Sequence, residues 1–298
     1  MRLFSIIGLV AALTAAPAAA EDMRILGFGR LFNNDRIGDG GDKWRTGSYQ
    51  FSIIRGRGWL GELPDRPFAL QEFRLRSEII APRGTTADRP YVGAASAGFH
   101  THFGLGPLGA SLGADVTAIG PQTGISALQE TYHDLFSIPD PQGTDTQLGN
   151  DVFLSGTAEL NWPVRLSDGV TLRPFVEAQA GVETLARIGA DVMIGEVGHE
   201  DMYVRDVITG QPIRAVEAEA TGFGFILGGD WAMVDSSAFL PASEGVAPTE
   251  ERYRARAGVQ WQMAEDLSFF YGATYLSEEF EGQDGGQILG SLKLNFNF

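Results

Sequence analysis

The sequence contains no cysteine and only four histidines among its 298 residues, and it has no basic cluster. A chain without cysteine is not a disulfide scaffold. Its net charge of -16 repels phosphate, so DNA, RNA and nucleotides are poor candidates as partners. With 44% hydrophobic residues the chain can bury a core, and disorder is not expected.

Long hydrophobic runs are also absent beyond the first twenty residues. Arg2, the apolar run 3–13 and small residues up to Ala20 predict a cleaved signal peptide over residues 1–20, and therefore export. The richest later stretch, 223–227, is far shorter than the ~18 residues that a membrane-crossing helix needs. A soluble periplasmic protein, a secreted protein and a transmembrane β-barrel remain as classes.

The C-terminal segment alternates between apolar and polar side chains up to its last residue. From Ile288 to Phe298 every second residue is apolar or glycine, and the residues between them are polar apart from Leu289. A period of two predicts a strand with one apolar face. A closing strand that ends in an aromatic residue is typical of bacterial outer-membrane barrels, so the sequence favours a single closed antiparallel transmembrane β-barrel.

The same alternation recurs upstream and predicts about twelve strands, an even number as closure requires. Because lipid offers the backbone no hydrogen-bond partners, such a sheet must close without a free edge. No boundary interrupts the pattern, so residues 21–298 are expected to form one outer-membrane barrel domain. The predicted strands are 23–32, 46–54, 71–81, 91–103, 110–119, 151–161, 170–182, 185–195, 220–233, 252–262, 267–277 and 286–298.

Short connections are expected on the periplasmic side and long loops outside. The segment 197–218 does not fit, because it would be an unusually long periplasmic connection; Thr209-Gly210 within it allows a small hairpin. Counting back from Phe298, the turn at 264–266 is periplasmic. The outer loops then lie near 33–45, 82–90, 120–150, 234–251 and 278–285.

The alternate residues of the strands that are expected to face the barrel interior are often charged. Arg252, Arg254 and Arg256 share the polar face of one strand, as Arg74 and Glu78 do on another. In a narrow barrel of about twelve strands, paired charges would fill the lumen. This disfavours a general diffusion pore, although a pore also needs a polar interior.

Three of the histidines have unremarkable settings. His100 and His102 share a parity on a predicted strand, so a metal pair is conceivable, but no third ligand is evident and two lumen or girdle histidines are the alternative. His199 lies in the 197–218 segment and is expected to be solvated.

His133 differs because residues 125–136 have helical composition and lie on an expected outer loop. A helix there stacks Gln129 and His133 on one face. Imidazole ionises near neutral pH, so at a membrane rim it can take a proton from water, and His133 is a candidate general base. A loop histidine without a catalytic role is the alternative.

Asn34 and Asp35 follow the first predicted strand and open the acidic loop 39–42. Their oxygens suit a hard cation such as calcium, although these residue types are also ordinary in turns and the spacing is not that of an EF-hand. No Gly-x-Ser-x-Gly marks a nucleophilic serine. Water activated by histidine and assisted by a cation fits the residues present.

Six strings occur in order along the chain, and together they resemble the outer-membrane lipid A 3′-O-deacylase (LpxR-type) family. Each string is modest alone, but their order and spacing cover nearly the whole chain after the signal peptide. They are Asn33-Asn34-Asp35, Asp42-Lys43-Trp44-Arg45-Thr46-Gly47, Asp88-Arg89-Pro90-Tyr91-Val92-Gly93, Ile119-Gly120-Pro121 through Gln129 to His133, Gln147-Leu148, and Glu279-Phe280-Glu281-Gly282-Gln283 before Gly290-Ser291-Leu292.

The resemblance implies a twelve-stranded barrel that removes the 3′-linked acyloxyacyl group of lipid A at the outer leaflet, dependent on calcium. His133 matches the family's catalytic histidine, which activates water. Asn34 and Asp35 match its essential pair, which would orient the histidine or hold the cation. Thr46 matches the threonine after the first outer loop and would donate a hydrogen bond, while Gln129 would fix the helix or contact substrate.

One departure from the family leaves other functions open. The family carries a lysine in the loop before the Asp-Arg string, whereas this chain has only Lys43 and Lys293, neither in that loop. Arg83 or Arg89 would then contact the substrate's phosphate or the oxyanion. The alternatives to a lipid A deacylase are a non-catalytic barrel of the same fold, structural or lipid-binding, and a small-solute channel.

Overall fold

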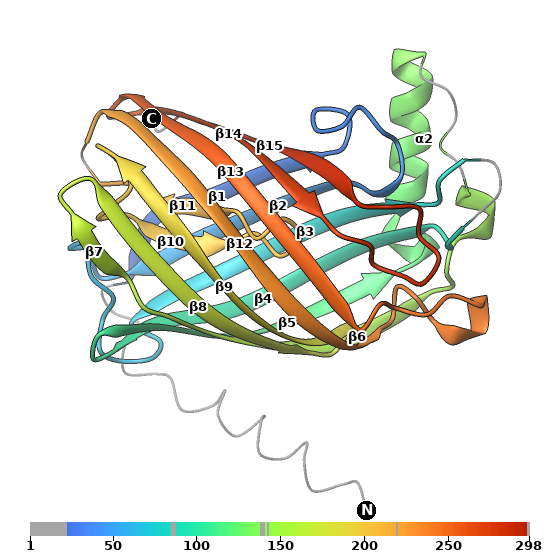
Figure 1. Cartoon of the computed structure of the whole chain (residues 1–298), viewed down its shortest axis with the longest axis horizontal. Coiled ribbons are helices and arrows are strands. Elements are labelled where there is room, and N and C mark those ends of the chain that lie inside the picture. The colour runs from blue at the N-terminus through green and yellow to red at the C-terminus, as the bar shows by residue number, and fades with distance from the viewer. Residues whose placement is uncertain (1–22, 85–87, 138–140, 142, 219, 297–298) are drawn as a thin grey trace, which may run out of the picture.

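The barrel predicted from the alternation is confirmed. The computed structural model describes residues 23–84, 88–137, 141, 143–218 and 220–296, and there twelve antiparallel strands form a closed wall (Figure 1). The wall closes because β1 pairs with β15 and β6 pairs with β8. The expected signal peptide and the last two residues lie outside the described part of the chain.

Each of the twelve predicted segments overlaps one wall strand. A short strand, β7 (Val164–Ser167), extends one edge of β8. The wall strands are β1 (Arg24–Asn34), β2 (Trp44–Gly56), β3 (Leu70–Ala81), β4 (Val92–Leu105), β5 (Leu108–Ile119), β6 (Asp151–Asn161), β8 (Val170–Ala180), β9 (Glu183–Gly195), β12 (Gly222–Ser237), β13 (Glu251–Ala264), β14 (Leu267–Leu276) and β15 (Gln287–Phe296).

The two faces of the wall differ as the period of two requires. On β13, Tyr253 and Trp261 are 48% and 41% exposed, whereas Arg252, Arg254 and Arg256 on the other face are buried. Apolar side chains therefore cover the outside and charged ones fill the inside, the arrangement that a lipid surround stabilises.

The helix expected on an outer loop is α2 (Ile125–Phe136), which stands at one end of the barrel (Figure 1). The same end carries the connections 35–43, 82–91, 120–150, 238–250 and 277–286, and it is named the helix end. Short 3-10 turns lie there as well: η1 (Pro121–Thr123), η2 (Thr144–Thr146) and η3 (Ala242–Glu244). No helix in the described residues is both long and apolar enough to cross a bilayer.

The segment 197–218 is not an extended periplasmic connection. It contains the hairpin β10 (Met202–Arg205) and β11 (Pro212–Val216), and the suggested hairpin at Thr209-Gly210 is its turn. The hairpin enters the barrel, because its apolar side chains are buried against inward residues of six wall strands. This burial explains the length that was unexpected for an exposed loop. The wall residues in contact are Leu31, Ile54, Leu70, Met193, Ile226 and Phe270.

Paired charges hold the hairpin and occupy much of the rest of the lumen, as predicted. Arg214 of the hairpin ion-pairs with Asp201, and Lys293 of β15 donates to Glu217 at 2.6 Å. Arg205 donates to Glu159 at 2.7 Å. Because these charged groups each have a partner of opposite sign, their burial inside the barrel is tolerated.

Candidate active site at the helix end

The first predicted site segment lies where β1 ends and β2 begins. Asn34 pairs with Gly47 in the ladder, and the Asp35 amide donates to the Thr46 carbonyl at 3.2 Å. The Thr46 hydroxyl lies 3.1 Å from Oδ2 of Asp35 and 3.1 Å from Oδ1 of Asp42. The structure therefore brings Asp35 and Thr46 together, and adds Asp42, which the sequence had indicated only as part of an acidic loop.

Two carboxylates thus converge on one hydroxyl, which has a single proton to donate. Burial raises the pKa of Asp35 to about 7, and the nearby Asp42 and Asp39 charges add to the effect, against the hydrogen bonds from Lys43 and Thr46. Such a pair suits a cation. In the described residues no three histidine or acidic side chains converge on a metal position, so an ion here would complete its shell with amide, hydroxyl or backbone oxygens.

Both polar atoms of the Asn34 side-chain amide make hydrogen bonds. Its Nδ2 donates to the Thr46 carbonyl at 3.0 Å, and its Oδ1 accepts from the Arg36 amide at 2.9 Å. These bonds fix the shape of the loop. The oxygen still has a second lone pair for a cation.

His133 and Gln129 occupy the face of α2 that packs on the barrel, as their spacing predicted. Each side chain is only 7% exposed, whereas Leu128 and Leu135 on the other face are 70% and 74% exposed. The Tyr91 hydroxyl donates to Oε1 of Gln129 at 2.8 Å, from the residue that precedes β4. Gln129 therefore anchors the helix one turn before His133.

Tyr91 anchors α2 from the loop 82–91. Burial raises the pKa of Tyr91, and the charges of Glu130 and Asp42 raise it further. The described hydrogen bonds join Asp35, Thr46 and Asp42 as one group and Tyr91 and Gln129 as another. Tyr91 was missed as a site residue, although it stands in the Asp-Arg-Pro-Tyr string.

Two cations flank the indole of Trp44 beside this loop. Lys43 Nζ lies 4.7 Å and Arg83 Cζ 5.9 Å from the ring centroid. The indole Nε1 donates to Oδ2 of Asp88 at 2.8 Å, which ties the loop 35–43 to the loop 82–91. Arg83 is 46% exposed and is free to reach a ligand at the rim, at the cost of its ion pair with Asp284.

Arg89, the other arginine expected to contact substrate, is directed inward. Its side chain is fully buried, donates to Oε2 of Glu279 at 2.9 Å and lies over Phe280. The same carboxylate group accepts from Arg45, which also pairs with Glu78. Arg89 therefore supports the ionic interior below the rim and does not face the position of a ligand outside.

The remaining histidines lie away from α2. His100 and His102 each bind a different carboxylate, Asp115 at 3.1 Å and Glu72 at 2.8 Å, so the conceivable metal pair does not form. His199 is partly buried rather than solvated, with Nδ1 2.8 Å from the Thr171 hydroxyl. These three side chains have structural partners.

The comparisons with known proteins agree with the barrel fold. A family model described as "Outer membrane protein LpxR" matches residues 4–298. The solved structure of LpxR from Salmonella typhimurium superposes with a TM-score of 0.74 at 17% identity, over 91% of this chain and 100% of that one. The NanC porin, at 7% identity and a TM-score of 0.43 over 91% of this chain and 100% of that one, is too distant to support an argument. No curated protein matches the sequence.

Proposed function

The chain belongs to the LpxR family of outer membrane proteins, and we propose that it hydrolyses the 3′-linked acyloxyacyl ester of lipid A in the outer leaflet. The observation that carries the proposal is that the loop 82–91 is tied to both parts of the site. Trp44, next to the Asp35 loop, donates to Asp88, and Tyr91 donates to Gln129 on the helix that bears His133. The proposed orientation places the helix end outside, so the site lies at the rim where lipid A resides.

His133 is the proposed general base. Its imidazole takes a proton from water as the water oxygen attacks the ester carbonyl carbon. The carbon–oxygen bond to the sugar-linked alkoxide then breaks, and the imidazolium returns the proton to that oxygen. The Tyr91–Gln129 hydrogen bond holds the helix, and hence the imidazole, against the barrel.

The Asp35 loop is the proposed calcium site. Asp35 and Asn34 would hold the ion, as the resemblance implies, with Asp42 alongside and Thr46 bridging the two carboxylates. When bound, calcium supplies positive charge to stabilise the oxyanion of the ester. Lys43 and Arg83, both next to the Trp44 ring, provide cationic groups for the phosphate of lipid A in place of the family's loop lysine.

Mass spectra of lipid A from cells expressing the protein test this function. We expect a species lacking the acyloxyacyl mass, lost on calcium chelation and absent with His133→Ala. Asp134→Asn, the exposed next residue on α2, is the matched control and should retain the product. Unchanged lipid A with folded wild-type protein would instead favour a non-catalytic member of the family, for which the missing loop lysine is the supporting observation.

A further inference from the structure

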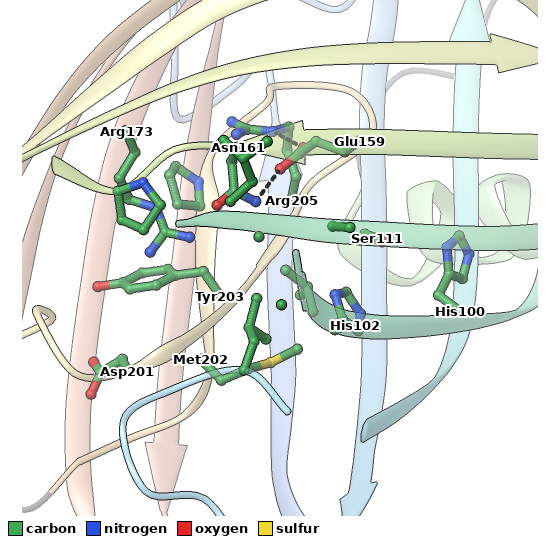
Figure 2. A pocket seen from close by; sticks show the side chains of 18 of the residues that line it. His100, His102, Ser111, Glu159, Asn161, Arg173, Asp201, Met202, Tyr203 and Arg205 are labelled. Carbon is green, nitrogen blue, oxygen red and sulfur yellow. Dashed lines mark hydrogen bonds and ion pairs between the residues drawn. The ribbon is translucent and has the colours of Figure 1, made fainter. Parts of the chain in front are cut away.

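A cavity of about 440 Å³ lies inside the barrel at the end opposite α2 (Figure 2). The turn between β4 and β5, the connection between β2 and β3, and the hairpin β10–β11 surround it. Trp59 at its edge donates to the Glu200 carbonyl at 2.7 Å and so joins two of these segments. The cavity is therefore separate from the proposed ester-hydrolysing site.

One side of the cavity borders a cluster of paired charges, and the rest of the lining includes Arg74 and the carboxylates of Glu62, Asp65 and Asp201. Each carboxylate of the cluster has an arginine partner within 3.5 Å. The cluster contains four carboxylates and five guanidinium groups: Glu159, Glu177, Asp191 and Asp230 with Arg173, Arg187, Arg205, Arg254 and Arg256.

Arg173 is the guanidinium group left over. Its cross-strand neighbour Asp191 is occupied by Arg205 at 2.9 Å and Arg256 at 2.6 Å. Within the described residues Arg173 makes no hydrogen bond or ion pair, and its Cζ lies 5.1 Å from the ring centroid of Tyr203. Figure 2 shows Arg173 and Tyr203 together on one side of the cavity. An unpaired cation in a confined site favours an anionic ligand.

Neutral polar groups accompany this cation. Oδ1 of Asn161 is buried without a hydrogen-bond partner in the described chain, while its Nδ2 donates to Glu159 at 3.2 Å. Ser111 and His102 line the side of the cavity opposite Arg173 (Figure 2). A carbonyl, a hydroxyl and an imidazole suit the hydroxyl groups of a ligand. The volume is that of an ordinary small-molecule site.

We propose that this cavity binds a small hydroxylated anion, such as a sugar acid or a sugar phosphate, with Arg173 on the anionic group and Asn161 and Ser111 on hydroxyls. The mouth lies among the connections at the end opposite α2, so in the proposed orientation the ligand enters from the periplasm. Ligand binding there requires no hydrolysis at the helix end.

Calorimetric titration of the purified full-length barrel in detergent tests the site. The probes are glucuronate for a carboxylate, glucose 6-phosphate for a phosphate, and glucose as the neutral match. We expect one of the two anions to bind at least roughly tenfold more tightly than glucose, since charge-assisted hydrogen bonds are the stronger ones. Arg173→Gln should abolish that preference, whereas Arg165→Gln, on exposed β7, should retain it.

A second variant covers the case in which Arg173→Gln fails to fold. Ser111→Phe keeps the guanidinium group but fills the cavity, so it should lose anion binding while the barrel remains folded by circular dichroism. The proposal is overturned if neither anion binds better than glucose, or if folded Ser111→Phe binds the anion as tightly as the wild type. Lipid A hydrolysis by Ser111→Phe is expected to be unchanged, which separates this site from the proposed function.

Discussion

At the scale of single residues, the contact between Tyr91 and Gln129 is the one most directly tied to the position of His133. Tyr91→Phe removes the donor and leaves the buried Gln129 amide oxygen unsatisfied, at a cost of about 1–3 kcal/mol. We expect a several-fold loss of kcat with a smaller change in KM. Adding Gln129→Leu removes the orphaned oxygen.

A double-mutant cycle measures that effect. The double variant Tyr91→Phe/Gln129→Leu should be more stable to denaturant than Tyr91→Phe alone, because both polar partners are then gone. Additive losses of stability would show that the two side chains do not act as a pair.

Glu279 is a single residue that makes the stability of the barrel depend on pH. Burial alone would raise its pKa, but the guanidinium groups of Arg45, Arg252 and Arg89 outweigh burial, and the pKa of Glu279 lies below its ordinary value. The stability it contributes is present above the ordinary carboxyl pKa and is lost as pH falls through the lower folded value. The barrel should therefore lose denaturant resistance as the pH falls below about 4.5.

Glu279→Gln should cost about 3 kcal/mol at neutral pH, because it leaves buried guanidinium groups without their partner. Its stability should also fall less between pH 6 and pH 3 than that of the wild type, as measured by urea unfolding in micelles. An unchanged pH profile would show that other carboxylates carry the acid sensitivity.

Residue positions were predictable where a local spacing carried them. The spacing of Gln129 and His133 placed both on one helix face, whereas the contact between Asp35 and Thr46 is known only from the structure. The inward direction of Arg89 could not be predicted, because it depends on Glu279, which is distant in sequence.

At the scale of elements, the hairpin β10–β11 decides whether the barrel is open. Its burial against six wall strands and its ion pairs close the interior, so the wild type should show no stable conductance in planar bilayers. Replacing residues 201–217 by a short Gly-Ser linker should open a channel, because the hairpin is then absent from the lumen. A short linker is sufficient, because both ends of the segment lie at the same end of the barrel. Equal conductance of the two proteins would contradict a plugging role.

The hairpin was the element least accessible from the sequence. Its apolar residues Met202, Val204, Ile213 and Ala215 do alternate, and this was the available indication of two short strands. The position of these strands inside the lumen depends on long-range contacts that no local pattern encodes. The wall strands were predictable because lipid on one side and charge on the other impose a period of two.

At the scale of the whole molecule, closure and orientation set where chemistry takes place. In the described residues the twelve wall strands close on themselves and their outer face is apolar, so the loops at the helix end are held at one membrane surface. Closure brings β15 beside β1, so that residues near both chain ends share one rim. In the proposed reaction His133 and Asp35 act together, which requires that both of their loops lie at this rim.

The most direct test of this account is a kinetic double-mutant cycle on ester hydrolysis of lipid A by the purified barrel with calcium. His133→Ala and Asp35→Asn should each reduce kcat by at least about a hundredfold, as expected for a missing base or a lost electrostatic group. The double variant should lose little more than the worse single variant, because residues of one catalytic unit are not additive. Fully multiplicative losses, or near wild-type hydrolysis by folded His133→Ala, would contradict a single site shared by the helix and the acidic loop.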